Sequence, residues 1–203
     1  MGRKSDARPR ILEAAARLLT SRSYASIGVA EICSEAGVPK GSFYYFFDSK
    51  LDLAKAVVDQ QWSDQQAEWQ KILGTDLPLE ERLRGLFDAT AKVQADSLSN
   101  TGSVCGCLFG NLALELTKEE AIIRERIQQV FEAQLDMIEA VLAEAADDPG
   151  IQISDPRGMA RAVVAQLEGL VLFAKLFDDP AQLDQMWSNT ARLLGIETAA
   201  QAA

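Results

Sequence analysis

Histidine is absent from the 203 residues of this chain. Imidazole is the most frequent general base, the usual activator of a nucleophile and the commonest ligand of zinc, so its absence argues against most hydrolytic and metal-dependent enzymes. Carboxylate or cysteine chemistry remains open without it, but we expect a protein that is not an enzyme, with no catalytic residue, no metal site and no cofactor.

Cysteine and long apolar segments are also scarce. The three cysteines, Cys33, Cys105 and Cys107, are an odd number, whereas secreted chains of this size more often carry an even disulfide set. Glu168 and Lys175 interrupt the most hydrophobic stretch, residues 163–177, which is shorter than the roughly 18 residues of a membrane-spanning helix. The N-terminus lacks the apolar segment of a secretory signal. These absences predict a cytoplasmic protein with no membrane partner.

Negative charge dominates the chain as a whole, with a formal net charge of −10, but it is unevenly distributed. Residues 1–55 carry nine Lys and Arg against six Asp and Glu, which leaves 11 against 24 for residues 56–203. Nucleic-acid binding depends on local charge, so the basic N-terminal part remains a candidate DNA-binding region.

Helical periodicity runs through almost the whole sequence, and no alternating pattern is long enough to predict a strand. Thr117 with Glu120 predicts a capping box, and Asp155 and Asp179 precede prolines suited to a first helical turn. We expect an all-α protein of about nine helices: 6–21, 28–35, 39–45, 48–73, 79–98, 107–116, 117–146, 157–177 and 181–194.

Two short helices near residues 28–35 and 39–45 are separated by Ala36–Val38, where Gly37 suits a left-handed turn. With the first helix they have the layout of a helix-turn-helix, whose last helix enters the major groove. Phe43, Phe46 and Phe47 are expected to hold this last helix in the core. Its lysine and tyrosines point elsewhere, although aromatic residues at helical spacing are also commonly core and lysines commonly solvated.

The segment "GVPKGSFYYFFDSK", residues 37–50, preceded by "VAEICSEA" and a basic first helix, resembles the DNA-binding domain of the TetR family of bacterial repressors. The resemblance covers about residues 7–55 and implies a homodimer on a palindromic operator, released by a small-molecule inducer. It implies a helix-turn-helix domain at 1–48 and a ligand-binding and dimerisation domain at 49–203. The family usually has threonine where this chain has Ile27, so Ser26 or the Gly28 backbone would substitute as a phosphate contact. The expected DNA contacts are Lys4, Ser26, Lys40, Gly41, Ser42, Tyr44, Tyr45 and Lys50.

A second motif, "CGCLFGNLALEL", residues 105–116, places two thiols at or just before a helix N-terminus. A helix N-terminus stabilises a thiolate, whereas apolar burial silences it, so the residues alone leave both a reactive thiol and a small buried side chain open. The segment is similar to that of TetR members whose cysteine, here Cys107, reacts with electrophiles or oxidants. Other members with similar segments bind small carboxylates or amphipathic compounds noncovalently. The alternative is a small helical cysteine-dependent redox or electrophile-modifying protein without DNA binding.

Two further sets of residues are expected in the C-terminal domain. A pocket between the middle helices would have apolar walls with a few amides, which suits a largely apolar ligand. Its candidates are Trp62, Phe87, Cys107, Phe109, Asn111, Phe131, Gln134 and Gln166. The last two helices are apolar nearly all round, which predicts a four-helix dimer interface. Its candidates are Val163, Leu167, Leu170, Val171, Ala174, Leu183, Met186 and Trp187.

Overall fold

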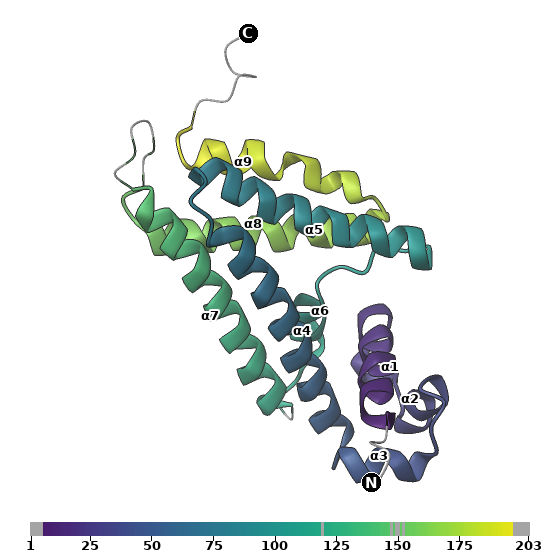
Figure 1. Cartoon of the computed structure of the whole chain (residues 1–203). Coiled ribbons are helices and arrows are strands. Elements are labelled where there is room, and N and C mark those ends of the chain that lie inside the picture. Colours follow the sequence, from purple (N-terminus) through teal and green to yellow (C-terminus); the bar gives the residue numbers. More distant parts are fainter. Residues whose placement is uncertain (1–5, 119, 147, 149–150, 152, 197–203) are drawn as a thin grey trace. The chain divides into compact units, whose positions relative to one another are not determined.

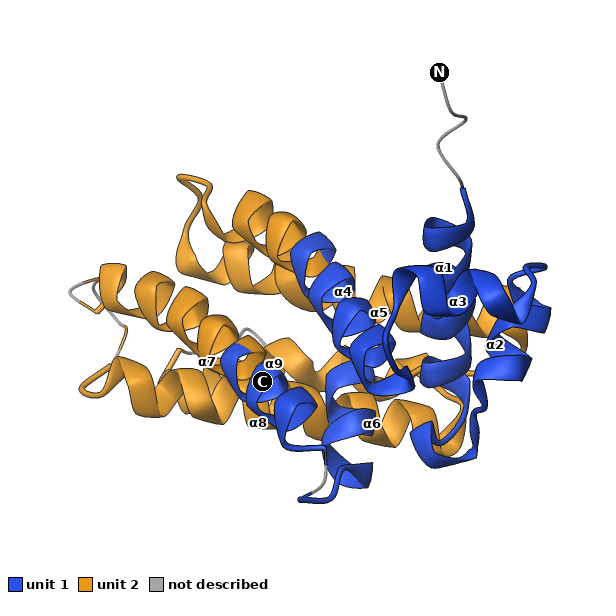
Figure 2. Cartoon of the chain, turned by 90° about the horizontal axis from the view of Figure 1, so that it is seen from below, with its two compact units in different colours: residues 1–64, 107–129 blue, residues 65–106, 130–203 orange. Residues whose placement is uncertain are grey.

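The computed structural model describes residues 6–118, 120–146, 148, 151 and 153–196. Within these residues the chain forms nine α-helices and two short 3₁₀-helices, with no strand, which confirms the all-α prediction (Figure 1). The residues divide into two compact units (Figure 2). The first comprises residues 1–64 and 107–129, and the second residues 65–106 and 130–203. The expected domain boundary at residue 48 stays a prediction.

The N-terminal helices of the first unit are α1 (Ala7–Ser21), the 3₁₀-helix η1 (Tyr24–Ser26), α2 (Val29–Glu35) and α3 (Lys40–Phe46). Ile11 and Ala14 of α1 are buried, as are Ile32 and Cys33 of α2. Burial raises the pKa of the Cys33 thiol more than the nearby Lys40 lowers it. These apolar faces form the core of the head, by which we mean α1, η1, α2 and α3.

The turn between α2 and α3 depends on Gly37, whose φ is +61°. Val38 N–H donates to the Cys33 carbonyl at 2.9 Å, and the guanidinium of Arg10 donates to the Gly37 carbonyl at 3.0 Å. A residue with a Cβ would be strained at this φ, and the Cβ would lie 2.5 Å from the Arg10 guanidinium. The predicted left-handed turn is confirmed.

Three further helices contribute residues to the first unit: α4 (Lys50–Leu73), α6 (Leu108–Glu115) and α7 (Ala121–Glu144). Ser49 caps α4, because its hydroxyl accepts a hydrogen bond from Asp52 N–H at 3.0 Å. The Glu120 carboxylate accepts bonds from the Thr117 hydroxyl and from Thr117 N–H, which lower its pKa. This pairing supplies the Glu120 contact expected of the predicted capping box.

The second unit contains α5 (Leu79–Thr101), α8 (Pro156–Phe177), η2 (Pro180–Gln185) and α9 (Met186–Leu193). Asp155 caps α8 by accepting a bond from Gly158 N–H, and Asp179 caps η2 by accepting one from Ala181 N–H. Both Asp-Pro predictions are therefore confirmed. The single helix expected over residues 181–194 is instead divided, because Pro180–Gln185 take the tighter 3₁₀ form and α9 begins at Met186.

Apolar packing dominates the second unit, in which α8 contacts η2, α5 and α9. One charged cluster adds to it: Arg157 at the start of α8 pairs with Glu132, Asp136 and Glu139 of α7. Within the described residues no helix is both long and apolar enough to cross a membrane.

Candidate nucleic-acid interface

Helix α3 divides its aromatic residues between the core and the surface. Phe43 and the following Phe47 are almost completely buried, whereas Tyr44 is 55% and Tyr45 82% exposed. Each tyrosine ring meets a phenylalanine edge-on, Tyr44 against Phe43 and Tyr45 against Phe46. The phenylalanines therefore fix the positions of two exposed tyrosines. Phe46 is only half-buried, so it contributes less to the core than its pattern predicts.

The smaller residues predicted to contact DNA lie on the same short helix. Lys40 and Gly41 are exposed and Ser42 is half-buried. A Cβ at Gly41 would meet nothing within 4 Å, so the backbone there is open to a large partner. With Tyr44 and Tyr45, these residues give α3 a surface of one cation, hydroxyl groups and accessible backbone, which suits phosphate, sugar and base edges.

Lys50 has internal contacts that the sequence did not suggest. Its ammonium donates to the carbonyls of Tyr24 at 2.9 Å and Ile27 at 3.1 Å, and lies 4.1 Å from the centre of the Tyr24 ring. These contacts bind the first turn of α4 to η1. They explain why a lysine lies at the start of this helix, without any contact to a phosphate. The predicted phosphate contact of Lys50 stays a prediction.

At the start of α2, isoleucine stands where the resemblance implies threonine. Ile27 is buried in the head, whereas Gly28 occupies the N-cap position without a side-chain cap. Ser26 is exposed, and its hydroxyl donates to the Ser23 carbonyl at 2.9 Å. The predicted contact at Ser26 therefore has an accessible hydroxyl. Lys4 lies outside the described residues.

Two acidic side chains of α2 form ion pairs with arginines. Glu31 and Glu35 of α2 pair with Arg22 and Arg17, respectively. Exposed ion pairs of this kind contribute little to folding, about 0–1 kcal/mol each. Their effect here is electrostatic, because they neutralise two carboxylates that would repel a phosphate backbone.

A polar network surrounds the turn at Cys105–Cys107, where Gly106 has a φ of +75°. The buried Gln94 of α5 accepts a bond from Gly106 N–H at 2.9 Å and donates to the Gly106 carbonyl at 3.4 Å. Cys107 is the N-cap of α6, and its sulfur accepts a bond from Gly110 N–H at 3.4 Å. The predicted thiol position is thus confirmed as a helix N-terminus. Gln94 was missed, although it follows Leu79, Leu83, Leu86 and Phe87 on the buried face of α5.

Glu115, at the other end of α6, was also missed by the sequence analysis. Its carboxylate accepts bonds from the Ser23 hydroxyl and from Tyr24 N–H, each at 2.7 Å. The contact joins residues 92 and 91 positions apart, and no local pattern could have signalled it. A second such contact joins Arg126 of α7 to Asp59 of α4 at 2.5 Å.

The predicted ligand-binding residues are divided equally between the two units. Trp62, Phe87, Phe109 and Gln134 are buried, whereas Phe131, Cys107, Asn111 and Gln166 are half-buried. Within the second unit, the Gln134 amide donates to Gln65 at 3.5 Å and the Gln166 amide to the Met186 carbonyl at 3.3 Å. Hydrogen bonds within the chain therefore account for the amides of Gln134 and Gln166 among apolar residues, without a ligand. Their grouping into one pocket stays a prediction.

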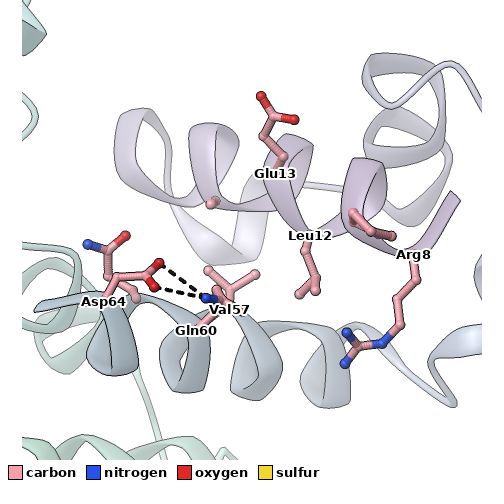
Figure 3. Close-up of a pocket in the computed structure, with 9 residues that line it drawn as sticks. Arg8, Leu12, Glu13, Val57, Gln60 and Asp64 are labelled. Carbon is pink, nitrogen blue, oxygen red and sulfur yellow. Dashed lines mark hydrogen bonds between the residues drawn. The ribbon is translucent and has the colours of Figure 1, made fainter. Parts of the chain in front are cut away.

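A pocket of about 430 Å³ lies within the first unit, between α1 and α4 (Figure 3). Leu12 points toward α4, Glu13 points away from it, and Arg8 and Asp64 lie at opposite ends (Figure 3). The Gln60 amide donates to both oxygens of Asp64 at 3.1 Å. None of the nine residues that line this pocket is among those predicted to bind a ligand.

The residues predicted for the dimer interface lie inside the second unit. Leu170 is half-buried and the other seven are buried: Val163, Leu167, Val171, Ala174, Leu183, Met186 and Trp187. Within one chain α8 contacts α5, η2 and α9, and the place of these eight residues in a dimer interface stays a prediction. The exposed apolar side chains of α8 are Leu172, Phe173, Leu176 and Phe177.

Comparisons with known proteins agree on both parts of the chain. The family model "Bacterial regulatory proteins, tetR family" matches residues 11–57, and "Tetracyclin repressor-like, C-terminal domain" matches residues 80–190. The transcriptional regulator AcuR of Cereibacter sphaeroides is 31% identical over 82% of this chain and 75% of its own length. The HTH-type transcriptional repressor DhaR of a Mycobacterium species is 27% identical over 90% and 89%, respectively. The crystal structure of a regulatory protein TetR from Rhodobacter sphaeroides is similar, with a TM-score of 0.81, 28% identity and coverage of 93% of this chain and 98% of that one.

Proposed function

Because the chain belongs to the TetR family of bacterial transcriptional regulators, we propose that it is a repressor that binds a palindromic operator as a homodimer and releases it on binding a small molecule. One observation carries the DNA-binding part. Helix α3 exposes Tyr44, Tyr45 and Lys40 while Phe43 and Phe47 anchor it, which is the arrangement that a recognition helix needs.

The proposed DNA contacts fall into two groups. Lys40, Tyr44 and Tyr45 reach the major groove, where the lysine ammonium and the tyrosine hydroxyls contact base edges or phosphates. Ser26, Gly41, Ser42 and Lys50 contact the phosphate backbone, and Lys4 adds a cation from the N-terminal segment. Because phosphate contacts release counterions, operator affinity falls steeply as salt rises.

A second copy of the chain is proposed to cover the exposed apolar side of α8. Leu172, Phe173, Leu176 and Phe177 recur on one face of the helix, and the rings of Phe173 and Phe177 lie 6.3 Å apart. Leu193 of α9 is also exposed. A twofold contact would bury these side chains against their symmetry mates.

The proposed inducer site comprises the eight residues predicted from the sequence, with Cys107 as its most reactive group. The hydrogen bond from Gly110 N–H to the Cys107 sulfur is of the kind that stabilises a thiolate, which supports covalent capture of an electrophile. A noncovalent ligand with a largely apolar body fits the remaining residues equally well. Cys107→Ser separates these alternatives, because it abolishes only a covalent response.

The test of DNA binding is a paired substitution on α3. The full chain first selects its preferred duplex from a random-sequence library, and affinity is then measured by fluorescence anisotropy. Lys40→Ala with Tyr44→Ala is expected to weaken binding at least about 100-fold, at about 1–3 kcal/mol for each lost contact. Lys118→Ala, at an exposed lysine of the same unit, is the matched control. Retained affinity in the double variant overturns the assignment of α3.

A further inference from the structure

Helix α3 begins at a residue that cannot cap it. Pro39 occupies the N-cap position, and a proline side chain has no oxygen to accept a bond from the first N–H groups of the helix. With seven residues, α3 is also too short to be stable by itself. Phe43 and Phe47 anchor one side of it in the core of the head. The direction of its N-terminal end therefore depends on the turn that enters it, residues 36–39.

This turn is held from both sides at a single peptide group, the one between Gly37 and Val38. Its N–H, on Val38, donates to the Cys33 carbonyl of α2 at 2.9 Å. Its carbonyl, on Gly37, accepts a bond from the guanidinium of Arg10 in α1 at 3.0 Å. Because both polar atoms are bound, and to different helices, the orientation of this peptide group is fixed. All four residues belong to the first unit.

The Arg10 guanidinium lies where a side chain at position 37 would begin. A Cβ built on Gly37 would be 2.5 Å from an Nη atom of Arg10, closer than non-bonded atoms can approach. Glycine is therefore required here for two separate reasons, the positive φ and the space that Arg10 occupies. A larger residue that tolerated this φ would still displace Arg10 from the carbonyl.

Arg10 differs from the two other arginines that contact α2. Arg17 and Arg22 end on carboxylates, those of Glu35 and Glu31, so their charges are neutralised. The Gly37 carbonyl carries no net charge, so the contact leaves the positive charge of Arg10 in place. An exposed guanidinium of this kind could hold the turn or contact a phosphate, and the two roles have different consequences for DNA binding.

We propose that Arg10 is a positioning residue for α3, which acts through the carbonyl of Gly37. The inference rests on the proposed DNA-binding function. By fixing the turn, Arg10 fixes the direction in which Lys40, Tyr44 and Tyr45 face a duplex, so α3 loses less conformational freedom on binding. The role is confined to the head and requires no contact between Arg10 and DNA.

The first test compares two duplexes and varies the salt concentration, with the full chain. Arg10→Met keeps an unbranched apolar stem and is expected to weaken binding of the selected duplex about threefold to tenfold, as expected for one partly exposed charge-assisted hydrogen bond. Affinity for a scrambled duplex changes less than about twofold, and the slope of log affinity against log salt is unchanged. A phosphate contact would instead weaken binding of both duplexes alike and lower the slope by about one.

Two controls accompany this substitution. Arg161→Met removes the same charge from an exposed residue of α8 and is expected to leave both affinities unchanged. Labelling of Cys33, which is 3% exposed, shows whether the head remains folded. If Arg10→Met makes Cys33 reactive, Gly37→Asn replaces it in the same comparison, because it removes the contact and leaves the charge of Arg10 in the chain.

A double-mutant cycle then tests whether Arg10 acts through Gly37. Asparagine adopts positive φ more readily than other residues with a Cβ, so Gly37→Asn chiefly displaces the guanidinium. Alone it is expected to weaken binding of the selected duplex about threefold or more. Once Arg10→Met is present, it should add less than about twofold, because the contact is already lost. Losses that multiply in full would show that the two residues act independently.

The outcomes separate this inference from the proposed function. If the wild-type chain selects no duplex, the proposed function is wrong. If it selects one, but Arg10→Met behaves like Arg161→Met, lowers the salt slope by about one or combines independently with Gly37→Asn, the proposed function stands and the positioning role of Arg10 is overturned.

Discussion

Both compact units have a buried apolar core, but they differ in the contacts that join their helices. In the first, Glu115, Lys50 and Arg126 join separate helices through polar contacts that are partly exposed to water. In the second, one face of α8 is buried against η2, α5 and α9 along almost its whole length. Partly exposed polar contacts contribute about 1 kcal/mol each, whereas a buried leucine contributes several times more. Loss of one of these polar contacts is therefore expected to cost less stability than loss of one buried leucine.

The largest expected effect tests the apolar packing of the second unit. Leu167→Ala in α8 removes a buried side chain and should lower the free energy of unfolding by about 2–5 kcal/mol. Urea denaturation at two protein concentrations measures the loss. If Leu167 served only the subunit contact, the loss would disappear as the protein is diluted into monomers; a loss independent of concentration supports its place in the core.

The exposed side of α8 is the next test. Phe173→Glu with Phe177→Glu places two carboxylates on the proposed twofold contact and should raise the dimer dissociation constant about 100-fold or more. Sedimentation velocity follows the change. Leu114→Glu, at an apolar residue of α6 that is 82% exposed, is the matched control and should leave the dimer intact. A double variant that sediments like the wild type would place the dimer contact elsewhere.

A substitution at Lys50 tests the polar contacts of the first unit. Lys50→Met keeps an unbranched apolar stem but removes the ammonium from two carbonyls and an aromatic ring, so we expect a loss of about 1–2 kcal/mol in unfolding free energy. The same variant reports on DNA. If Lys50 also contacts a phosphate, the slope of log affinity against log salt falls by about one; an unchanged slope limits Lys50 to its internal role.

Asp59 gives the smallest expected effect, through pH. Burial alone would raise the pKa of this carboxyl, but hydrogen bonds from Lys55 and Arg126 outweigh burial and lower the pKa below its usual value. A lowered pKa in the folded state means that the stabilisation is present above the unfolded pKa and is lost as pH falls through the folded one. Asp59→Asn should therefore cost less than about 1 kcal/mol near neutral pH, since the pair is partly exposed, and nothing at strongly acidic pH. Thermal melts of the wild type and the variant measure this. A difference in melting temperature that stays the same at every pH would contradict the assignment.

The sequence predicted the helices well because their start and stop signals are local. Asp155, Asp179 and Gly37 each act on residues within a few positions, so a pattern in the chain specifies the contact. The exposed tyrosines of α3 were predicted by the register of the TetR resemblance, since aromatic content alone indicates core.

Long-range partners were not predictable in the same way. The Glu115 contact depends on two segments about 90 residues apart, and the internal contacts of Lys50 depend on how η1 lies beside the start of α4. The side of α8 that stays exposed in one chain was not predictable for a related reason. The number of apolar residues indicates how much apolar surface must be buried. The packing of η2 and α5 decides which face of α8 is already covered within the chain.

Burial of Cys33 simplifies the chemistry of the whole chain. Because its side chain is almost inaccessible and its thiol pKa is raised, Cys33 reacts slowly with maleimides or peroxides in the folded state. Cys105 and Cys107 are half-buried and adjacent to one glycine. The number of thiols labelled under native conditions therefore reports on Cys105 and Cys107, in the turn that enters α6. Labelling of a third thiol, Cys33, indicates that the head has unfolded.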